Sequence, residues 1–122
     1  MTAVAVPLSI ETFLFANRIQ LQLCGELDIA TAPLLQDRLA SAFSAGPTHV
    51  VLDVSGLDFV DSSGAALFLS AHKRSVSEGV DLSIRGARPQ FLQLLQVTGL
   101  VDLLDVVPRG IQTVAAVAFP AD

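Results

Sequence analysis

The chain of 122 residues is 52% hydrophobic and 16% charged, and its formal net charge is −5 at pH 7. This composition fits a single domain with a dense aliphatic core, and it excludes a disordered chain. The acidic balance argues against a nucleic-acid partner bound through its phosphates, and no apolar run reaches the roughly 18 residues that would cross a membrane.

The first two predicted elements are strands that form a hairpin. Residues 8–14 have the composition of a strand, residues 16–18 suit a turn, and residues 19–23 alternate strictly between apolar and polar side chains. Cys24, the only cysteine in the chain, follows in an apolar context, which predicts a buried thiol. A lone cysteine suits a reducing compartment, and no basic leader of a signal peptide is visible, so we expect a cytoplasmic protein without direct membrane insertion.

After the hairpin, helical and strand patterns alternate to the end of the chain. A helix is predicted over about 31–45, because three large apolar residues recur at helical spacing: Leu35, Leu39 and Phe43. The elements that follow are a strand, a helix, a strand, a helix, a strand and a short terminal helix, over about 49–54, 63–78, 82–85, 89–98, 104–107 and 111–119. The apolar face of the second helix is expected to include Ala65, Phe68, Leu69 and Val76.

This order of elements predicts an α/β fold. Strands that alternate with helices form largely parallel sheets, and the opening hairpin adds an antiparallel strand at the N-terminal edge. We therefore expect a mixed β-sheet with about four helices packed on it, in a single domain over residues 1–122 whose core spans about 8–119. Short strand-to-helix loops then place residues 25–28 and 61–64 at the same end of the sheet.

The tetrapeptide Asp61-Ser62-Ser63-Gly64 joins a predicted strand to a predicted helix. A serine hydroxyl there faces solvent beside free N–H groups and the positive end of the helix dipole, which suits a reversible phosphate. A second interpretation is structural: Ser62 or Ser63 caps the helix, since Ser and Asp are leading N-cap residues. The tetrapeptide alone favours the cap.

Signatures of enzymes and metal sites are missing from the sequence. It has no G-x-S-x-G elbow and no P-loop, and His49 and His72 make no metal-ligand spacing with Cys24. A phosphoaspartate receiver built around Asp53 would need an acidic pair after its first strand and a lysine after a late strand, but Lys73 is the only lysine. We therefore predict a protein that is not an enzyme and that has no cofactor or metal ion.

Three stretches, in order, resemble the STAS domain of bacterial anti-sigma factor antagonists. Residues 25–32 (GELDIATA) are similar to the family's G-E-L-D-x-x-T-A segment, and residues 50–64 (VVLDVSGLDFVDSSG) to its strand and loop that end in the phosphorylated serine. Residues 97–100 (VTGL) are similar to the turn after its third helix. The resemblance extends over almost the whole chain and implies the same mixed fold. Ala65 and Ala66 depart from the pattern, because family members often carry Leu-Gly or similar there.

The resemblance implies a partner switch. The chain would bind an anti-sigma factor that is also an ATP-dependent serine kinase, so that a sigma factor is released and transcription is regulated. The kinase would phosphorylate Ser62, with Ser63 as the second choice, and a cognate phosphatase would reverse the modification. The binding surface that the family implies comprises Asp28, Asp61, Ser62, Ser63, Gly64 and Leu67.

Two other interpretations stay open. A STAS module of a different kind, such as the regulatory subunit of a lipid-transport ABC system or the tail of another transporter, would use the same loop for docking without a phosphate. Such small modules tend to carry Thr in place of the serine, so Ser62 favours the antagonist. A small-molecule or nucleotide sensor has only Arg85 and Arg88 in its support, and these suit a solvated edge and a helix start.

Overall fold

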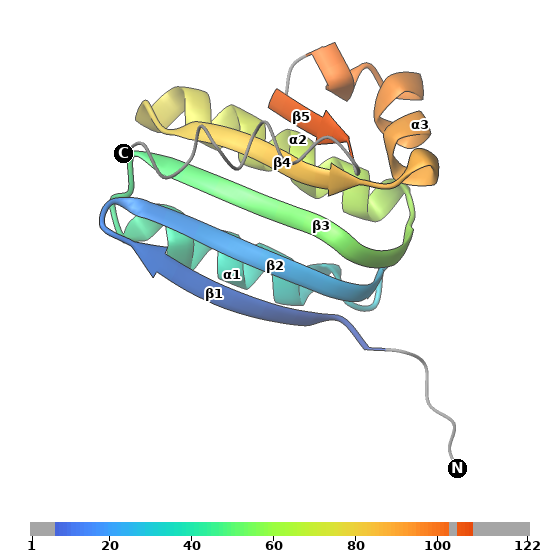
Figure 1. Ribbon diagram of the computed structural model, residues 1–122, viewed down its shortest axis with the longest axis horizontal. Helices are drawn as coiled ribbons and strands as arrows, with labels where there is room; N and C mark the ends of the chain where they lie inside the picture. The colour runs from blue at the N-terminus through green and yellow to red at the C-terminus, as the bar shows by residue number, and fades with distance from the viewer. Residues whose placement is uncertain (1–6, 103–104, 109–122) are drawn as a thin grey trace.

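The computed structural model describes residues 7–102 and 105–108 (Figure 1). In these ranges the chain forms strands, α-helices and one short 3-10 helix in the order β1 (Ser9–Phe15), β2 (Arg18–Leu27), α1 (Ala32–Ser44), β3 (His49–Val60), α2 (Ser62–Glu78), β4 (Asp81–Ala87), α3 (Pro89–Val97), η1 (Leu100–Asp102) and β5 (Asp105–Pro108). Apart from η1, which was not predicted, this order agrees with the prediction as far as β5. The described ranges thus contain three of the roughly four helices expected, and the terminal helix predicted over 111–119 lies outside them.

The strands form one mixed sheet in the order β1-β2-β3-β4-β5. β1 runs antiparallel to β2, whereas the pairs β2–β3, β3–β4 and β4–β5 are parallel. The prediction of a mainly parallel sheet with an antiparallel N-terminal edge strand is therefore confirmed. Figure 1 shows α1 and α2 side by side behind the sheet, with α3 near β4 and β5.

The neighbouring strands β2 and β3 are longer than the sequence pattern predicted. β2 continues through Gly25 to Leu27, and β3 continues through Gly56 to Val60, although glycine normally weakens a strand. Register shifts between β2 and β3 accommodate these glycines, and Gly25 adopts a φ of 110° that other residues avoid. Both strands therefore reach the same end of the sheet before their loops begin.

The core fills the space between the sheet and the helices. The side chains of Leu35, Leu39 and Phe43 are buried, as the helical spacing predicted, and the Phe68 and Phe91 rings pack with centroids 5.2 Å apart. The expectation for Val76 was wrong, because this side chain is 68% exposed. The helical period of 3.6 residues instead turns the neighbouring Ser75 inward, and the Ser75 hydroxyl donates to the His72 carbonyl at 2.7 Å.

Cys24 lies on the face of the sheet opposite the leucines of β2. Buried and half-buried residues alternate along this strand, and Cys24 is one of the half-buried ones, so the prediction of a buried thiol was wrong. Its Sγ lies against Gly56, where an added Cβ would come within 2.5 Å of the sulfur. Over the described residues, no helix combines the length and the hydropathy that crossing a membrane requires.

Candidate functional site

The loops after β2 and β3 lie beside each other at one end of the sheet. β2 and β3 are parallel, Leu27 pairs with Val60, and the Asp61 N–H donates to the Leu27 carbonyl at 3.2 Å. This bond brings the Asp28 loop next to the start of α2. The structure thus brings together the two loops that the sequence assigned to the same end of the sheet.

The Asp28 loop is held by a dense set of local hydrogen bonds. Asp28 Oδ1 accepts from the main-chain N–H groups of Ala30 and Thr31, both at 3.0 Å. The Thr31 hydroxyl donates to the Glu26 carbonyl at 2.8 Å and accepts from the Asp28 N–H at 3.0 Å. The loop is therefore a preformed turn, and it presents Ile29 to solvent with 77% of the side chain exposed.

Asp61, not a serine, caps helix α2. Its backbone is extended (φ −106°, ψ −172°), and its Oδ1 accepts from the N–H groups of Ser63 at 2.9 Å and Gly64 at 3.2 Å. The structural interpretation of Ser62 or Ser63 as the cap is therefore wrong. The physical reason is that a residue takes the cap only where its backbone leaves the helical region, and Ser62 is already the first helical residue.

Ser62 is exposed, whereas Ser63 is half-buried. Within the part of the chain that the structure describes, the hydroxyl of Ser62 makes no hydrogen bond. This hydroxyl stands at the N-terminus of a helix of 17 residues, where the helix dipole favours an anion. Of the two serines, Ser62 is the more accessible to a modifying enzyme.

Gly64 allows the start of α2 to sit directly on the ends of β2 and β3. An added Cβ there would lie 2.8 Å from Leu27 Cγ and Cδ2 and 2.9 Å from Val60 Cγ1. Gly64 is buried, so its contribution to the predicted surface is structural: it seats the start of α2 against Leu27 and Val60. Leu67, one turn further along, is half-buried in a groove of about 220 Å³ between α1 and α2.

Several exposed apolar side chains near these loops were missed by the sequence prediction. Ile29 stands at the tip of the Asp28 loop, Leu34 in the first turn of α1 is 51% exposed, and Phe59 near the end of β3 is 49% exposed. In the sequence they look like core residues, because apolar residues at element ends give no sign of the direction they face. The one available signal was Asp58, a charged residue next to Phe59 that interrupts the apolar pattern and so indicates that this part of the strand reaches solvent.

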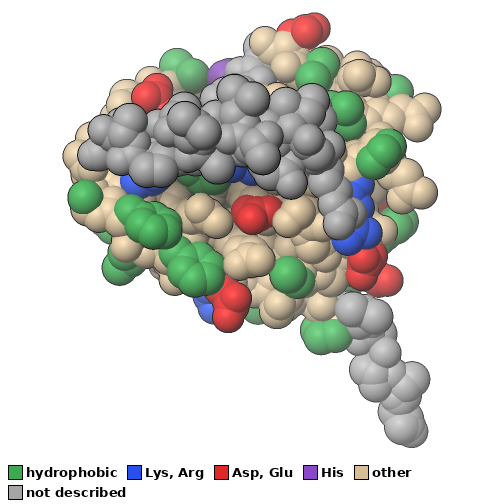
Figure 2. Space-filling view, viewed as in Figure 1, with side chains coloured by type: hydrophobic (Ala, Val, Ile, Leu, Met, Phe, Trp, Pro, Cys, Tyr) green, Lys and Arg blue, Asp and Glu red, His purple; other side chains and the backbone are tan. Residues whose placement is uncertain are grey.

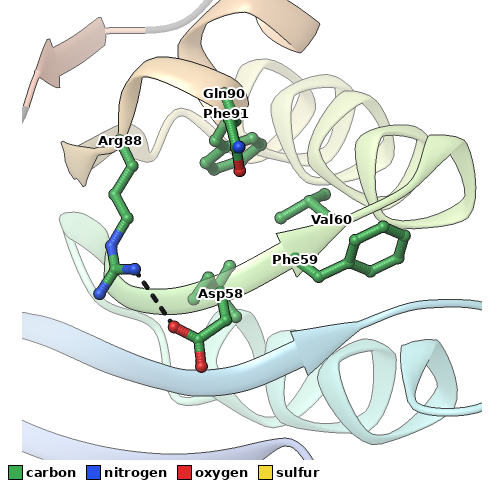
Figure 3. Close-up of a pocket in the computed structure, with 7 residues that line it drawn as sticks. Asp58, Phe59, Val60, Arg88, Gln90 and Phe91 are labelled. Carbon is green, nitrogen blue, oxygen red and sulfur yellow. Dashed lines mark hydrogen bonds and ion pairs between the residues drawn. The ribbon is translucent and has the colours of Figure 1, made fainter.

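A pocket of about 340 Å³ lies between the end of β3 and the start of α3. Figure 3 shows Arg88 reaching from the start of α3 to Asp58, with Phe59 further along the same strand. Arg88 Nη1 lies 3.2 Å from Asp58 Oδ1, and Arg88 Nε donates to the Ser55 carbonyl at 3.0 Å. Arg88 therefore joins the start of α3 to β3. The sequence had suggested only that Arg88 solvates the start of a helix.

The other polar residues singled out in the sequence lie away from these loops or serve local structure. Asp53 Oδ1 accepts from both the N–H and the hydroxyl of Ser55, at 3.0 and 2.7 Å, so its carboxylate stabilises β3. His49, at the other end of β3, lies 3.0 Å from the Ser83 hydroxyl. Throughout the described ranges, no three His, Cys, Asp or Glu side chains are grouped so that they could hold a metal ion.

Comparison with known proteins places this fold and these loops in one family. The family model described as "Mlab, STAS domain" matches residues 15–107, and the chain therefore belongs to the STAS domain family. The anti-sigma-B factor antagonist of Staphylococcus epidermidis is 30% identical over 99 residues, which are 81% of this chain and 92% of that protein. The resemblance inferred from the three motifs is thus confirmed.

Solved structures show the same fold. An anti-sigma factor antagonist from Mycobacterium paratuberculosis matches with a TM-score of 0.80 and 20% identity, over 94% of this chain and 99% of that one. The phosphorylated form of SpoIIAA, a Bacillus cell fate determinant, matches with a TM-score of 0.66 and 20% identity, over 90% of this chain and 98% of its own. At these identities the likeness concerns the architecture alone.

Proposed function

We propose that this protein is a cytoplasmic anti-sigma factor antagonist whose binding is switched by phosphorylation of Ser62. One observation at the start of α2 carries the proposal: the Asp61 side chain caps the helix, and the Ser62 side chain stays exposed. The names of the curated relatives support the proposal, as does the existence of a phosphorylated form of SpoIIAA, a protein with this fold. The protein acts as a binder and a kinase substrate, not as an enzyme.

In the proposed switch, the partner is an anti-sigma factor that is also a serine kinase. The Ser62 oxygen forms a bond to the γ-phosphorus of ATP, the bond to ADP breaks, and the hydroxyl proton passes to a base of the kinase. A cognate phosphatase hydrolyses the phosphoserine and restores the hydroxyl. Ser63 is the second choice for the modification, because its side chain is half-buried and less accessible.

The electrostatics of the loops support an off switch. The phosphate adds about −1.5 to −2 charges, and the helix N-terminus stabilises part of this charge in the free protein. In a closed interface the same phosphate would lie beside the capping carboxylate of Asp61, the preceding residue, with its water removed. The free protein therefore tolerates the phosphate better than the complex does, and binding weakens.

The apolar neighbours of Ser62 would supply most of the binding energy. Ile29, Leu34 and Phe59 are exposed near the two loops, and the groove that contains Leu67 continues between α1 and α2. Exposed apolar side chains beside preformed loops are typical of surfaces that bind another protein. This surface extends the set predicted from the sequence by these exposed residues.

Binding of the purified protein to its anti-sigma factor, measured by titration calorimetry, tests the proposal. Ser62→Asp should weaken binding by about 100-fold, or about 2.7 kcal/mol, and Ser62→Ala should bind like the unphosphorylated protein. Ser77→Asp is the matched control, because it adds the same charge at an exposed serine near the other end of α2. Unchanged binding of Ser62→Asp would rule out the switch.

A STAS docking subunit without a phosphate cycle, for a lipid-transport ABC system or another transporter, is the second candidate. The preformed Asp28 loop and the exposed Ile29 support the docking subunit as well as they support the antagonist, since they suit docking whether or not Ser62 is modified. A pull-down from the native cells with wild-type and Ser62→Asp baits separates the two candidates. A kinase-domain partner lost by Ser62→Asp supports the antagonist, and a transport ATPase held by both baits supports the docking subunit.

A further inference from the structure

The outer edge of the sheet carries apolar side chains far from the Ser62 loops. Among the described residues β1 is an edge strand that pairs with β2 alone, and its last residues Phe13, Leu14 and Phe15 are 39%, 72% and 51% exposed. Figure 2 shows hydrophobic side chains gathered over the part of the sheet beside the β1–β2 turn. An edge strand that ends in exposed apolar side chains is a template for pairing with another strand.

The hairpin geometry identifies which main-chain groups of β1 point outward. Phe15 and Arg18 flank a two-residue turn, so they form a hydrogen-bonded pair, and the residues that point outward alternate from there: Leu14, Thr12 and Ile10. The contact from Arg38 Nη1 to the Ile10 carbonyl, at 2.9 Å, agrees with this assignment. Within the described residues, the main-chain groups of Thr12 and Leu14 have no other partner.

We propose that two copies of this chain associate through their β1 edges, antiparallel, around a two-fold axis at Phe13. In this register Thr12 of each copy faces Leu14 of the other, and every free N–H of these residues meets a free carbonyl. A register centred on Thr12 would instead bring the Ile10 carbonyl, already bonded to Arg38, into the ladder. The free groups therefore favour Phe13 as the centre.

Side chains on the exposed face suit the same register. Phe13 of one copy lies opposite Phe13 of the other, as a non-hydrogen-bonded pair, the kind in which side chains approach most closely. An aromatic pair at such a position is favourable. Glu11 of one copy lies opposite Phe15 of the other copy, and that Phe15 pairs with Arg18 on β2 of its own chain. Glu11 and this Arg18 therefore lie in one cross-strand row, with opposite charges. The two Glu11 carboxylates stand on opposite sides of the axis, about 13 Å apart along the strands.

The proposed contact leaves the Ser62 loops open. Phe13 pairs with Gln20, which precedes Leu27 by seven residues, or about 23 Å along β2. The dimer would therefore carry two independent partner-binding surfaces. The inference goes beyond the proposed switch and does not depend on it.

Sedimentation velocity of the full chain, over a concentration series from micromolar to millimolar, tests the association. We expect a reversible dimer whose dissociation constant rises about tenfold or more in Leu14→Pro, because proline removes an outward N–H while an edge strand tolerates it. Val76→Ser, at an exposed apolar residue on α2, should leave the constant unchanged. A wild-type chain that stays monomeric throughout would overturn the proposal.

Disulfide trapping tests the register without a proline. In a Cys24→Ser background, Phe13→Cys places two thiols on the axis with Cα atoms about 4.5 Å apart, within the range that a disulfide spans. Glu11→Cys is the matched control, because it faces Phe15 of the second copy and not itself. Rapid cross-linking of Phe13→Cys alone supports the register, and equal cross-linking of both variants, or of neither, overturns it.

Discussion

Asp61 Oδ1 accepts hydrogen bonds from the N–H groups of Ser63 and Gly64, so the cap of α2 depends on a carboxylate. The adjacent Ser62 side chain is not needed for capping. Asp61→Ala should lower the free energy of unfolding by about 1 kcal/mol, the usual cost of a lost N-cap. Ser62→Ala, at an exposed side chain without a hydrogen bond, should change it by less than about 0.5 kcal/mol. Urea denaturation measures both values.

Asp61→Asn is the control for this prediction. Asparagine keeps an acceptor oxygen at the cap and removes only the charge, so it should recover most of the lost stability. A larger loss in Ser62→Ala than in Asp61→Ala would contradict the assignment, since it would make Ser62 the structural residue.

Single residues also show why the candidate site could be predicted only in part. The positions of Asp28 and Ser62 could be predicted because short loops after parallel strands always meet at one end of a sheet. The identity of the cap could not, because Asp61 and both serines are good caps and only the backbone angles decide among them. The exposure of Ile29 could not be predicted either, since it depends on the direction of a turn fixed by Asp28 and Thr31.

At the scale of elements, the position of α2 depends on Gly64. Gly64→Ala should lower the free energy of unfolding by about 1–2 kcal/mol, because the new methyl overlaps Leu27 and Val60. The cost of this overlap exceeds the stability that alanine gains over glycine from its better helix propensity. Thermal unfolding measures the effect, with Ser70→Ala on the exposed side of the same helix as the control. In a Leu27→Ala background the extra cost should fall, because only the overlap with Val60 is left, and strict additivity of the two changes would contradict the overlap.

The lengths of the elements show a second limit of sequence patterns. α1 lies within about one residue of its predicted range, because its apolar spacing is strict and Pro33 lies in its first turn. The ends of β2 and β3 were predicted too early, because Gly25 and Gly56 look like strand ends and become part of the sheet only through pairing between distant strands. That pairing is a tertiary property, and no local window of sequence contains it.

At the scale of the whole molecule, two surfaces lie at separate places on one sheet. The Ser62 loops stand at the carboxyl ends of β2 and β3, and the apolar end of β1 stands beside the hairpin turn. The two surfaces share no residue, so a charge at Ser62 should not change self-association. Sedimentation of Ser62→Asp should therefore give the wild-type dissociation constant for the dimer, and a shift of tenfold would show that the surfaces are coupled.

Two partner-binding surfaces on the proposed dimer should also make partner binding depend on the density of the partner. On a sensor with densely immobilised anti-sigma factor, a wild-type dimer can hold two partners at once, so it should dissociate more slowly than Leu14→Pro by about tenfold or more. On a sparse sensor both proteins should dissociate alike, because Leu14 lies outside the partner surface and each site binds with the same intrinsic affinity. Equal dissociation at high density would show that the two sites of the dimer cannot be occupied together. A difference on the sparse sensor would instead place the end of β1 within reach of the partner.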